Sequence, residues 1–212
     1  MVCRRLVGVV VALPLVASCL SRTSRVPITD AVYGAYDARR ISSTATTGTL
    51  SGGKLGYEAR QSEARLAGMI EGGCLVAGSG GLSIFSVGAG GKFAALKQGI
   101  VELGVMGLLE YQRVRLEKLQ NGNDLVAIGV GAYGEIRVIP NVALTLTLSA
   151  NAFFDATPAT TCNDGSTSGS TGSGTCSHHD GIGFYNDKLG DGSNLDALIG
   201  VSVWFGGESS AH

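Results

Sequence analysis

The sequence is short of charge, of net charge of either sign and of long apolar runs. Charged residues make up 16% of its 212 residues, against about 25% in ordinary soluble domains, which fits a chain with little water-facing surface. The formal net charge of −1 argues against a basic surface for nucleic acid. The apolar run at 6–16 is too short to cross a bilayer as a helix. Aromatic residues are also scarce, at 6%.

Residues 1–18 have the pattern of a signal peptide, with two arginines, an apolar core and small residues before a cleavage point. The run VASC at 16–19 resembles the bacterial lipobox. That resemblance implies that Cys19 is acylated and becomes the mature N-terminus. Because Leu20 is not aspartate, it also implies an outer-membrane lipoprotein. The alternative is ordinary secretory cleavage at the same bond, with Cys19 as a simple N-terminus.

Aliphatic residues alternate with small or polar residues through 125–155, on both sides of Pro140-Asn141. Successive side chains of a strand point to opposite faces of a sheet, so this period predicts two strands joined by a tight turn. One face is aliphatic, and the other is small or polar. The aliphatic face consists of Val126, Ile128, Val130, Ala132, Gly134, Ile136 and Val138, then Val142, Leu144, Leu146, Leu148, Ala150, Ala152 and Phe154.

The polar face of the second strand is built from threonine, serine and asparagine, with no charge before Asp155. Small side chains suit the crowded interior of a narrow barrel, and an outward aliphatic band suits lipid. The sequence therefore favours a barrel that faces lipid. The alternative is a soluble sandwich or barrel with the aliphatic face buried inside.

Further strand segments extend the pattern along the chain. The fold class expected is all-β, an antiparallel up-and-down β-barrel of eight strands, with the eighth strand taken from 45–51. We expect 1–18 to be the signal peptide, 19–44 an N-terminal linker with the lipid anchor, 45–206 the barrel with a long loop at 158–194, and 207–212 a tail. The eight strand segments are 45–51, 54–61, 64–77, 78–96, 100–112, 125–139, 142–155 and 195–205.

The alternating last strand that ends on Phe205, the hairpin and the long loop together resemble the small bacterial outer-membrane β-barrel family, porin-like proteins of eight strands. In that family short turns face the periplasm and long loops face outside. The resemblance implies an outer-membrane location and the same orientation here. This chain departs from the family pattern because seven residues follow Phe205.

Candidate site residues fall into two groups besides Cys19. Cys162 and Cys176 flank a Ser/Gly stretch in an exported loop, where disulfides persist, so we expect them to be bridged. Inward charges must pair inside a barrel, so we expect a polar network in the lumen. Its predicted members are Glu102, Glu110, Glu135, Arg137 and Asp155.

The function expected is a structural or surface-interaction role without an open pore, because side chains fill a narrow barrel. We expect no enzyme activity, no cofactor, no metal site and no nucleic-acid partner. Outer-membrane lipids are the expected partners, with an unidentified surface ligand or envelope protein. Two alternatives remain: a periplasm-facing lipoprotein whose soluble β-domain binds an apolar ligand inside, and a lipid-modifying outer-membrane enzyme.

Overall fold

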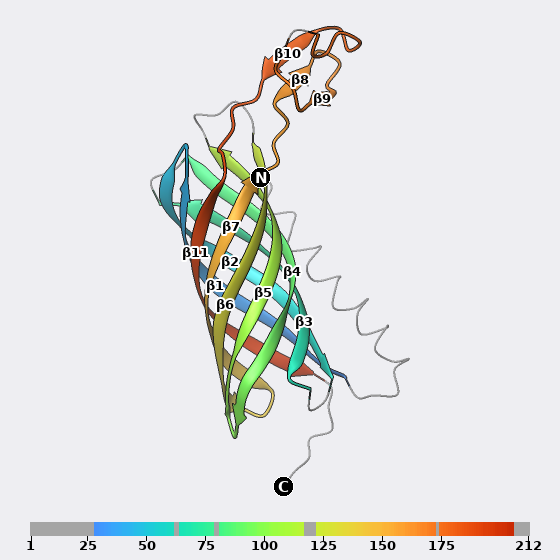
Figure 1. Ribbon diagram of the computed structural model, residues 1–212. Coiled ribbons are helices and arrows are strands. Elements are labelled where there is room, and N and C mark those ends of the chain that lie inside the picture. The colour runs from blue at the N-terminus through green and yellow to red at the C-terminus, as the bar shows by residue number, and fades with distance from the viewer. Residues whose placement is uncertain (1–27, 62–63, 79–80, 117–121, 173, 206–212) are drawn as a thin grey trace.

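The structure, a computed structural model, describes residues 28–61, 64–78, 81–116, 122–172 and 174–205. Within these residues eight long strands form one closed barrel, and three short strands form a small sheet in the loop after the seventh strand (Figure 1). The short strands are β8 (Thr160–Cys162), β9 (Thr167–Ser168) and β10 (Ile182–Tyr185). The barrel strands are β1 (Ile28–Ser43), β2 (Thr47–Gln61), β3 (Leu66–Ala77), β4 (Leu82–Gln98), β5 (Val101–Leu116), β6 (Asn123–Ile139), β7 (Val142–Asp155) and β11 (Gly192–Phe205).

Each barrel strand pairs antiparallel with the strands next to it in the chain, and β1 pairs with β11 to close the ring. The register of that closing pair runs from Asp30 opposite Phe205 to Ser43 opposite Gly192. This is an up-and-down barrel, so the predicted fold class is confirmed. The described part of the chain holds no helix long and apolar enough to cross a membrane.

The hairpin of β6 and β7 shows the alternation that the sequence predicts. Leu146 and Leu148 on β7 are about half exposed, whereas Thr147 and Phe153 on the same strand are buried. The two strands turn at Pro140-Asn141. Because the aliphatic set points outward on both strands, the buried interior of this protein is the lumen of the barrel.

The assignment of 19–44 to a linker is wrong from Ile28 onward, because β1 occupies Ile28–Ser43. The strand was missed because its inward face carries Asp37 and Arg39, which are fully buried in the lumen. Charges of this kind make a sequence look like a water-exposed linker, yet here they satisfy one another inside the barrel. β1 is the eighth strand that the sequence analysis sought at 45–51.

The segments 45–51 and 54–61 are not two strands but one, β2. Gly52 and Gly53 do not end the strand, since they pair with Leu75 and Cys74 of β3 without a break. A Cβ atom at Gly52 would lie 2.0 Å from the carbonyl oxygen of Cys74. Glycine at this position therefore allows a close approach of the two backbones and does not mark a turn.

The two ends of the barrel differ. β1 begins and β11 ends beside the turn at Pro140-Asn141, where the amide of Trp204 donates to the carbonyl oxygen of Asn141, 2.8 Å away. The loop between β7 and β11 projects from the opposite end (Figure 1). We call these the terminal end and the loop end. The predicted long loop is shorter than 158–194, because β11 already begins at Gly192.

Candidate functional site

A first group of ion pairs lies inside the barrel toward the loop end. The guanidinium of Arg39 lies 3.2 Å from Glu110 and 2.8 Å from Asp196. The ammonium of Lys54 lies 2.6 Å from Glu71 and 3.2 Å from Glu110. All of these side chains are buried, so their charges are balanced by one another and not by water. We call this group the loop-side cluster; its members are Asp37, Arg39, Lys54, Glu71, Glu110 and Asp196.

A second group, the terminal-side cluster, lies inside the barrel nearer to the terminal end. Arg60 contacts Glu102 at 2.6 Å and Glu58 at 2.8 Å. Lys92 lies 2.7 Å from Glu58 and 3.3 Å from Glu135. Glu58 therefore joins both bases, and the cluster forms a continuous chain across the lumen from β2 to β6. Its members are Glu58, Arg60, Lys92, Glu102 and Glu135.

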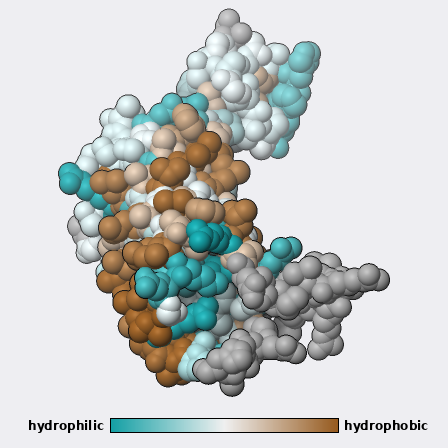
Figure 2. Space-filling view, turned by 60° about the horizontal axis from the view of Figure 1, so that its bottom comes forward, coloured by the Kyte–Doolittle hydropathy of each residue, from teal (hydrophilic) through white to brown (hydrophobic). Residues whose placement is uncertain are grey.

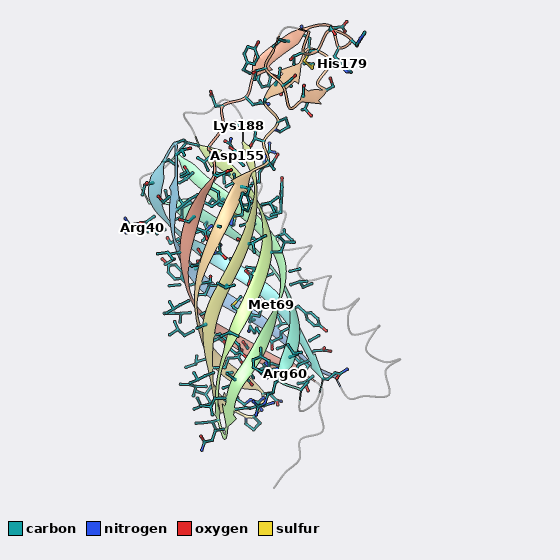
Figure 3. The ribbon with its side chains drawn as sticks, in the orientation of Figure 1. Arg40, Arg60, Met69, Asp155, His179 and Lys188 are labelled. Atoms are coloured by element: carbon teal, nitrogen blue, oxygen red, sulfur yellow. A yellow bond between two sulfur atoms is a disulfide. The ribbon has the colours of Figure 1, made fainter. Side chains whose placement is uncertain are left out.

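An aromatic and thioether layer separates the two clusters and also connects them. The ammonium of Lys92 lies over the rings of Tyr33 and Tyr133, 5.4 Å and 5.0 Å from their centroids, a cation–π geometry. The Tyr33 hydroxyl donates to Glu71 at 2.6 Å, and the Tyr133 hydroxyl donates to Glu102 at 2.8 Å. Each tyrosine thus has its ring beside Lys92 and donates a hydrogen bond from its hydroxyl to a carboxylate. Met69, labelled in Figure 3, belongs to the same layer.

The lumen has little free space. The cavity beside Tyr33, Lys54 and Thr147 measures about 20 Å³, which is room for a single water molecule. An apolar ligand cannot fit there, so the interior does not support the alternative of a soluble domain with an internal ligand.

At the loop end the lumen is closed by an apolar plug to which the loop contributes Leu189. Leu189 is completely buried against the plug. The Thr44 hydroxyl donates to the carbonyl oxygen of Leu189 at 3.2 Å, and the amide of Gly190 donates to Asp155 at 2.8 Å. The returning arm of the loop is therefore fixed across the mouth of the barrel. The barrel part of the plug is Ile41, Leu50, Leu75, Leu82, Ile84, Val114, Leu125, Ala127 and Phe153.

The predicted lumen residues are distributed over both clusters and beyond them. Glu102 and Glu135 lie in the terminal-side cluster and Glu110 in the loop-side cluster. The expectation that Arg137 and Asp155 join the same network is wrong. Arg137 is exposed at the terminal end, 5.8 Å from the ring centroid of Trp204. Asp155 lies at the loop end, where its carboxylate accepts from the amides of Thr157 and Gly190.

Sequence reasoning missed the basic partners of this network. Three of them, Arg39, Lys54 and Arg60, belong to β1 and β2, the strands that the sequence analysis placed wrongly. Lys92 lies on β4, inside a correctly expected strand segment. The signal that they share is parity, because each of the four occupies an inward, buried position of its strand.

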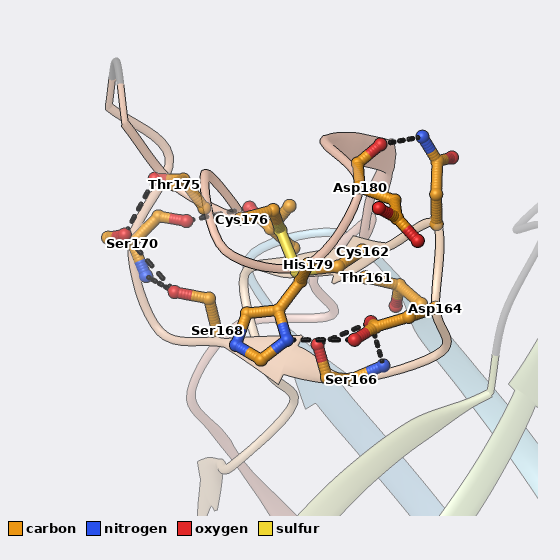
Figure 4. The surroundings of a disulfide bond; sticks show 12 residues. Thr161, Cys162, Asp164, Ser166, Ser168, Ser170, Thr175, Cys176, His179 and Asp180 are labelled. Atoms are coloured by element: carbon orange, nitrogen blue, oxygen red, sulfur yellow. Dashed lines mark hydrogen bonds and ion pairs between the residues drawn. A yellow bond between two sulfur atoms is a disulfide. The ribbon is translucent and has the colours of Figure 1, made fainter.

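The long loop is a small folded unit. The predicted disulfide between Cys162 and Cys176 is present, and it joins β8 to the turn before β10 (Figure 4). Asp164 accepts from the hydroxyl and the amide of Ser166 at 2.6 Å and 2.9 Å, and it lies 2.8 Å from Nδ1 of His179. The hydrogen bonds from Ser166, and then the contact with His179, lower the pKa of Asp164 to about 2.

No set of three or more His, Cys, Asp or Glu side chains in the described ranges has the arrangement of a metal site. Asp164 and His179 form a pair, and the pair is exposed to solvent. The contacts of the loop thus build a folded surface structure.

The outer wall of the barrel has the opposite character to its interior. Large aliphatic and aromatic side chains are exposed on every barrel strand, and they cover much of the wall in Figure 2. A soluble protein of this size does not leave such a band exposed, and a barrel that crosses a membrane requires it. The fold is that of a small outer-membrane β-barrel.

A solved structure of a bacterial surface protein shares this fold, and two further bacterial proteins match more weakly. Neisserial surface protein A (NspA) matches with a TM-score of 0.56 at 16% sequence identity, over 83% of this chain and 97% of that one. The attachment invasion locus protein Ail of Yersinia pestis matches with a TM-score of 0.49 at 12% identity, over 84% and 98% of the two chains. A major outer membrane protein of Thermus thermophilus matches with a TM-score of 0.46 at 12% identity, over 84% and 99%. No protein-family model and no curated protein sequence matches the chain.

Proposed function

We propose that the chain is a bacterial outer-membrane protein whose barrel serves as a structural anchor for a surface-exposed loop. The observation that carries this proposal is the inverted distribution of polarity. Ion pairs such as Arg39–Glu110 and Arg60–Glu102 are buried inside, while Leu146, Ile199 and their neighbours are exposed outside. That distribution is stable when lipid, and not water, surrounds the barrel.

The role is interaction and not transport or catalysis. Two ion-pair clusters and an apolar plug fill the lumen, so the barrel is not an open pore. The exposed His179 has Asp164 as its partner, and no hydrogen bond joins its ring to a serine nucleophile in the part of the chain described. The disulfide-closed loop is the part of the protein available to a surface ligand or an envelope partner.

In this proposal the loop end faces outside, and the terminal end faces the periplasm. Residues 1–18 direct export, and Cys19 carries acyl chains that add a second attachment to the membrane. Residues 1–19 and the tail 207–212 lie outside the described residues. Support for the orientation comes from loop length, since the connection between β7 and β11 is far longer than the turn at Pro140-Asn141.

The orientation is tested with two epitope tags in the full-length chain. A tag at Ser170, in the exposed part of the loop, should bind antibody on intact cells. A tag at Asn141 should bind antibody only after the outer membrane is opened. The reverse pattern would contradict the orientation, and two hidden tags would favour a periplasmic protein. A heat-dependent gel shift of each tagged chain confirms that its barrel is folded.

Attachment of lipid is tested separately by mass spectrometry. The intact mature protein should carry a lipid increment on Cys19, and Cys19→Ala should abolish it. An unmodified Cys19 at the mature N-terminus would show that residues 1–18 act as an ordinary secretory signal.

A further inference from the structure

The apolar outer wall ends at a sharp border on β1 and β2. The outward positions of β1 change from Tyr36 and Ala38 to Arg40, and Arg40 lies opposite Thr49 of β2. Arg40 is exposed and points away from the barrel near its loop end (Figure 3). It therefore occupies the depth at which lipid headgroups meet the hydrocarbon region.

Arg40 has no carboxylate within ion-pair distance among the described residues. In this respect it differs from Arg113, an outward arginine near the loop end of β5, which forms an ion pair with Asp124. An unpaired guanidinium at headgroup depth is complementary to a phosphate, because it can donate two parallel hydrogen bonds to phosphate oxygens.

Next to Arg40, the outer wall is hollowed. Ala38 of β1 lies opposite Ala197 of β11, and Ala150 of β7 lies opposite Leu195. Three small side chains on adjacent strands form the floor, and larger ones rise around it, which leaves a hollow of about 670 Å³. The larger outward side chains are Val130, Leu148 and Leu195.

We propose that Arg40 and this hollow form a binding site for a phosphorylated glycolipid of the outer leaflet. The guanidinium of Arg40 contacts a phosphate of the headgroup, and an acyl chain lies across Ala38, Ala150 and Ala197. The site rests on the proposed function, because only an outer-membrane barrel with its loop end outside meets this leaflet. Charge complementarity accounts for the phosphate group, and the hollow orients an acyl chain.

The test uses the full-length protein folded in phosphatidylcholine nanodiscs. The discs contain a small fraction of phosphorylated lipid A, of the same lipid A without phosphate, or of phosphatidylglycerol. Lipid that stays on the barrel after transfer to detergent is counted by native mass spectrometry. The wild type should retain one phosphorylated lipid A, and Arg40→Gln should lower that retention about fivefold, the effect expected of one basic residue at an anionic membrane surface.

Two variants separate the site from a general positive rim. Arg115→Gln removes another exposed arginine near the loop end of β5 and should leave retention unchanged. Ala197→Trp fills the hollow without changing charge and should lower retention as Arg40→Gln does. Equal losses in Arg40→Gln and Arg115→Gln would overturn the site, and so would full retention in Ala197→Trp.

The comparison of the three nanodisc compositions identifies the class of lipid that binds. Equal retention of phosphorylated and phosphate-free lipid A by an inserted wild-type barrel overturns the site but leaves the proposed function standing. If the wild type retains phosphatidylglycerol as well as it retains phosphorylated lipid A, the ligand is not specifically a glycolipid and the proposed site is overturned. A wild-type chain that stays in water and does not insert overturns the proposed function and this site together. A heat-dependent gel shift verifies that each variant is folded.

Discussion

Arg60 holds Glu102 with both ends of its guanidinium, Nη1 to Oε2 at 2.6 Å and Nη2 to Oε1 at 2.7 Å. The two residues are 42 positions apart in the sequence and lie on β2 and β5. The ring of Trp204 lies 5.3 Å from the guanidinium carbon of Arg60. This bidentate contact is the geometry expected of a strong arginine–carboxylate pair, and Arg60 is labelled in Figure 3 in the half of the barrel toward the terminal end.

Replacing Arg60 should destabilise the barrel strongly. Arg60→Met leaves Glu58 and Glu102 buried with fewer partners, which should cost about 3–5 kcal/mol of unfolding free energy. Urea unfolding in phospholipid vesicles measures the change. The double variant Arg60→Met, Glu102→Gln should recover part of the loss, because it removes one uncompensated charge. Additive effects of the two substitutions would contradict a direct interaction.

A charge on the outer wall should be costly only where lipid surrounds it. Leu146, which is 49% exposed, lies inside β7 (Val142–Asp155) with its side chain on the outer wall. Leu146→Arg should lower the unfolding free energy in vesicles by about 2–4 kcal/mol. Thr47→Arg, at the loop end of β2, is the matched control and should change the unfolding free energy little. Normal stability of Leu146→Arg in bilayers would show that β7 does not face hydrocarbon.

Leu189 should contribute to barrel stability although it belongs to the loop. Leu189→Ala removes a fully buried side chain from the apolar plug and should cost about 2–5 kcal/mol. The control is Leu195→Ala on the outer wall, where the side chain is 60% exposed and no internal cavity is created. If both substitutions have the same small effect in equilibrium unfolding, the loop does not close the lumen in solution.

Asp164 gives the loop a pH response in the acid range. Its folded pKa of about 2 lies below the value of about 3.9 in unfolded chains. The stabilisation from this carboxylate is therefore complete above about pH 4 and is lost as the pH falls through 2. An NMR titration should find the low midpoint. Ser166→Ala should raise that midpoint because it removes the hydroxyl donor to Asp164, while the hydrogen bond from the amide of residue 166 remains. An unchanged midpoint in Ser166→Ala would show that the Ser166 hydroxyl does not cause the low pKa of Asp164.

The sequence predicts the barrel well where both faces carry a clear pattern. Along β6 and β7 the outward residues are mostly aliphatic because lipid is uniformly apolar, and most inward residues are small or polar, so period two is visible. Along β1 the inward face carries Asp37 and Arg39, and the outward face includes Arg40. Both faces are then mixed, and the pattern that identifies a membrane strand is lost.

The pairing of charges in the lumen could not be predicted from the sequence. Arg39 and Glu110 are 71 positions apart, and they meet because β1 and β5 lie across the barrel from each other. Which inward residues meet depends on strand order, tilt and stagger around the whole ring. The disulfide was predictable because Cys162 and Cys176 are close in sequence, in a loop with a clear composition.

The pairing of β1 with β11 sets the order in which the protein can be completed. Among the described barrel strands β11 leaves the ribosome last, and it must pair with both β1 and β7. Until then β1 and β7 each present an unpaired edge, which other chains can join. The ring therefore closes only after synthesis, and the chain needs protection from aggregation throughout its passage to the membrane.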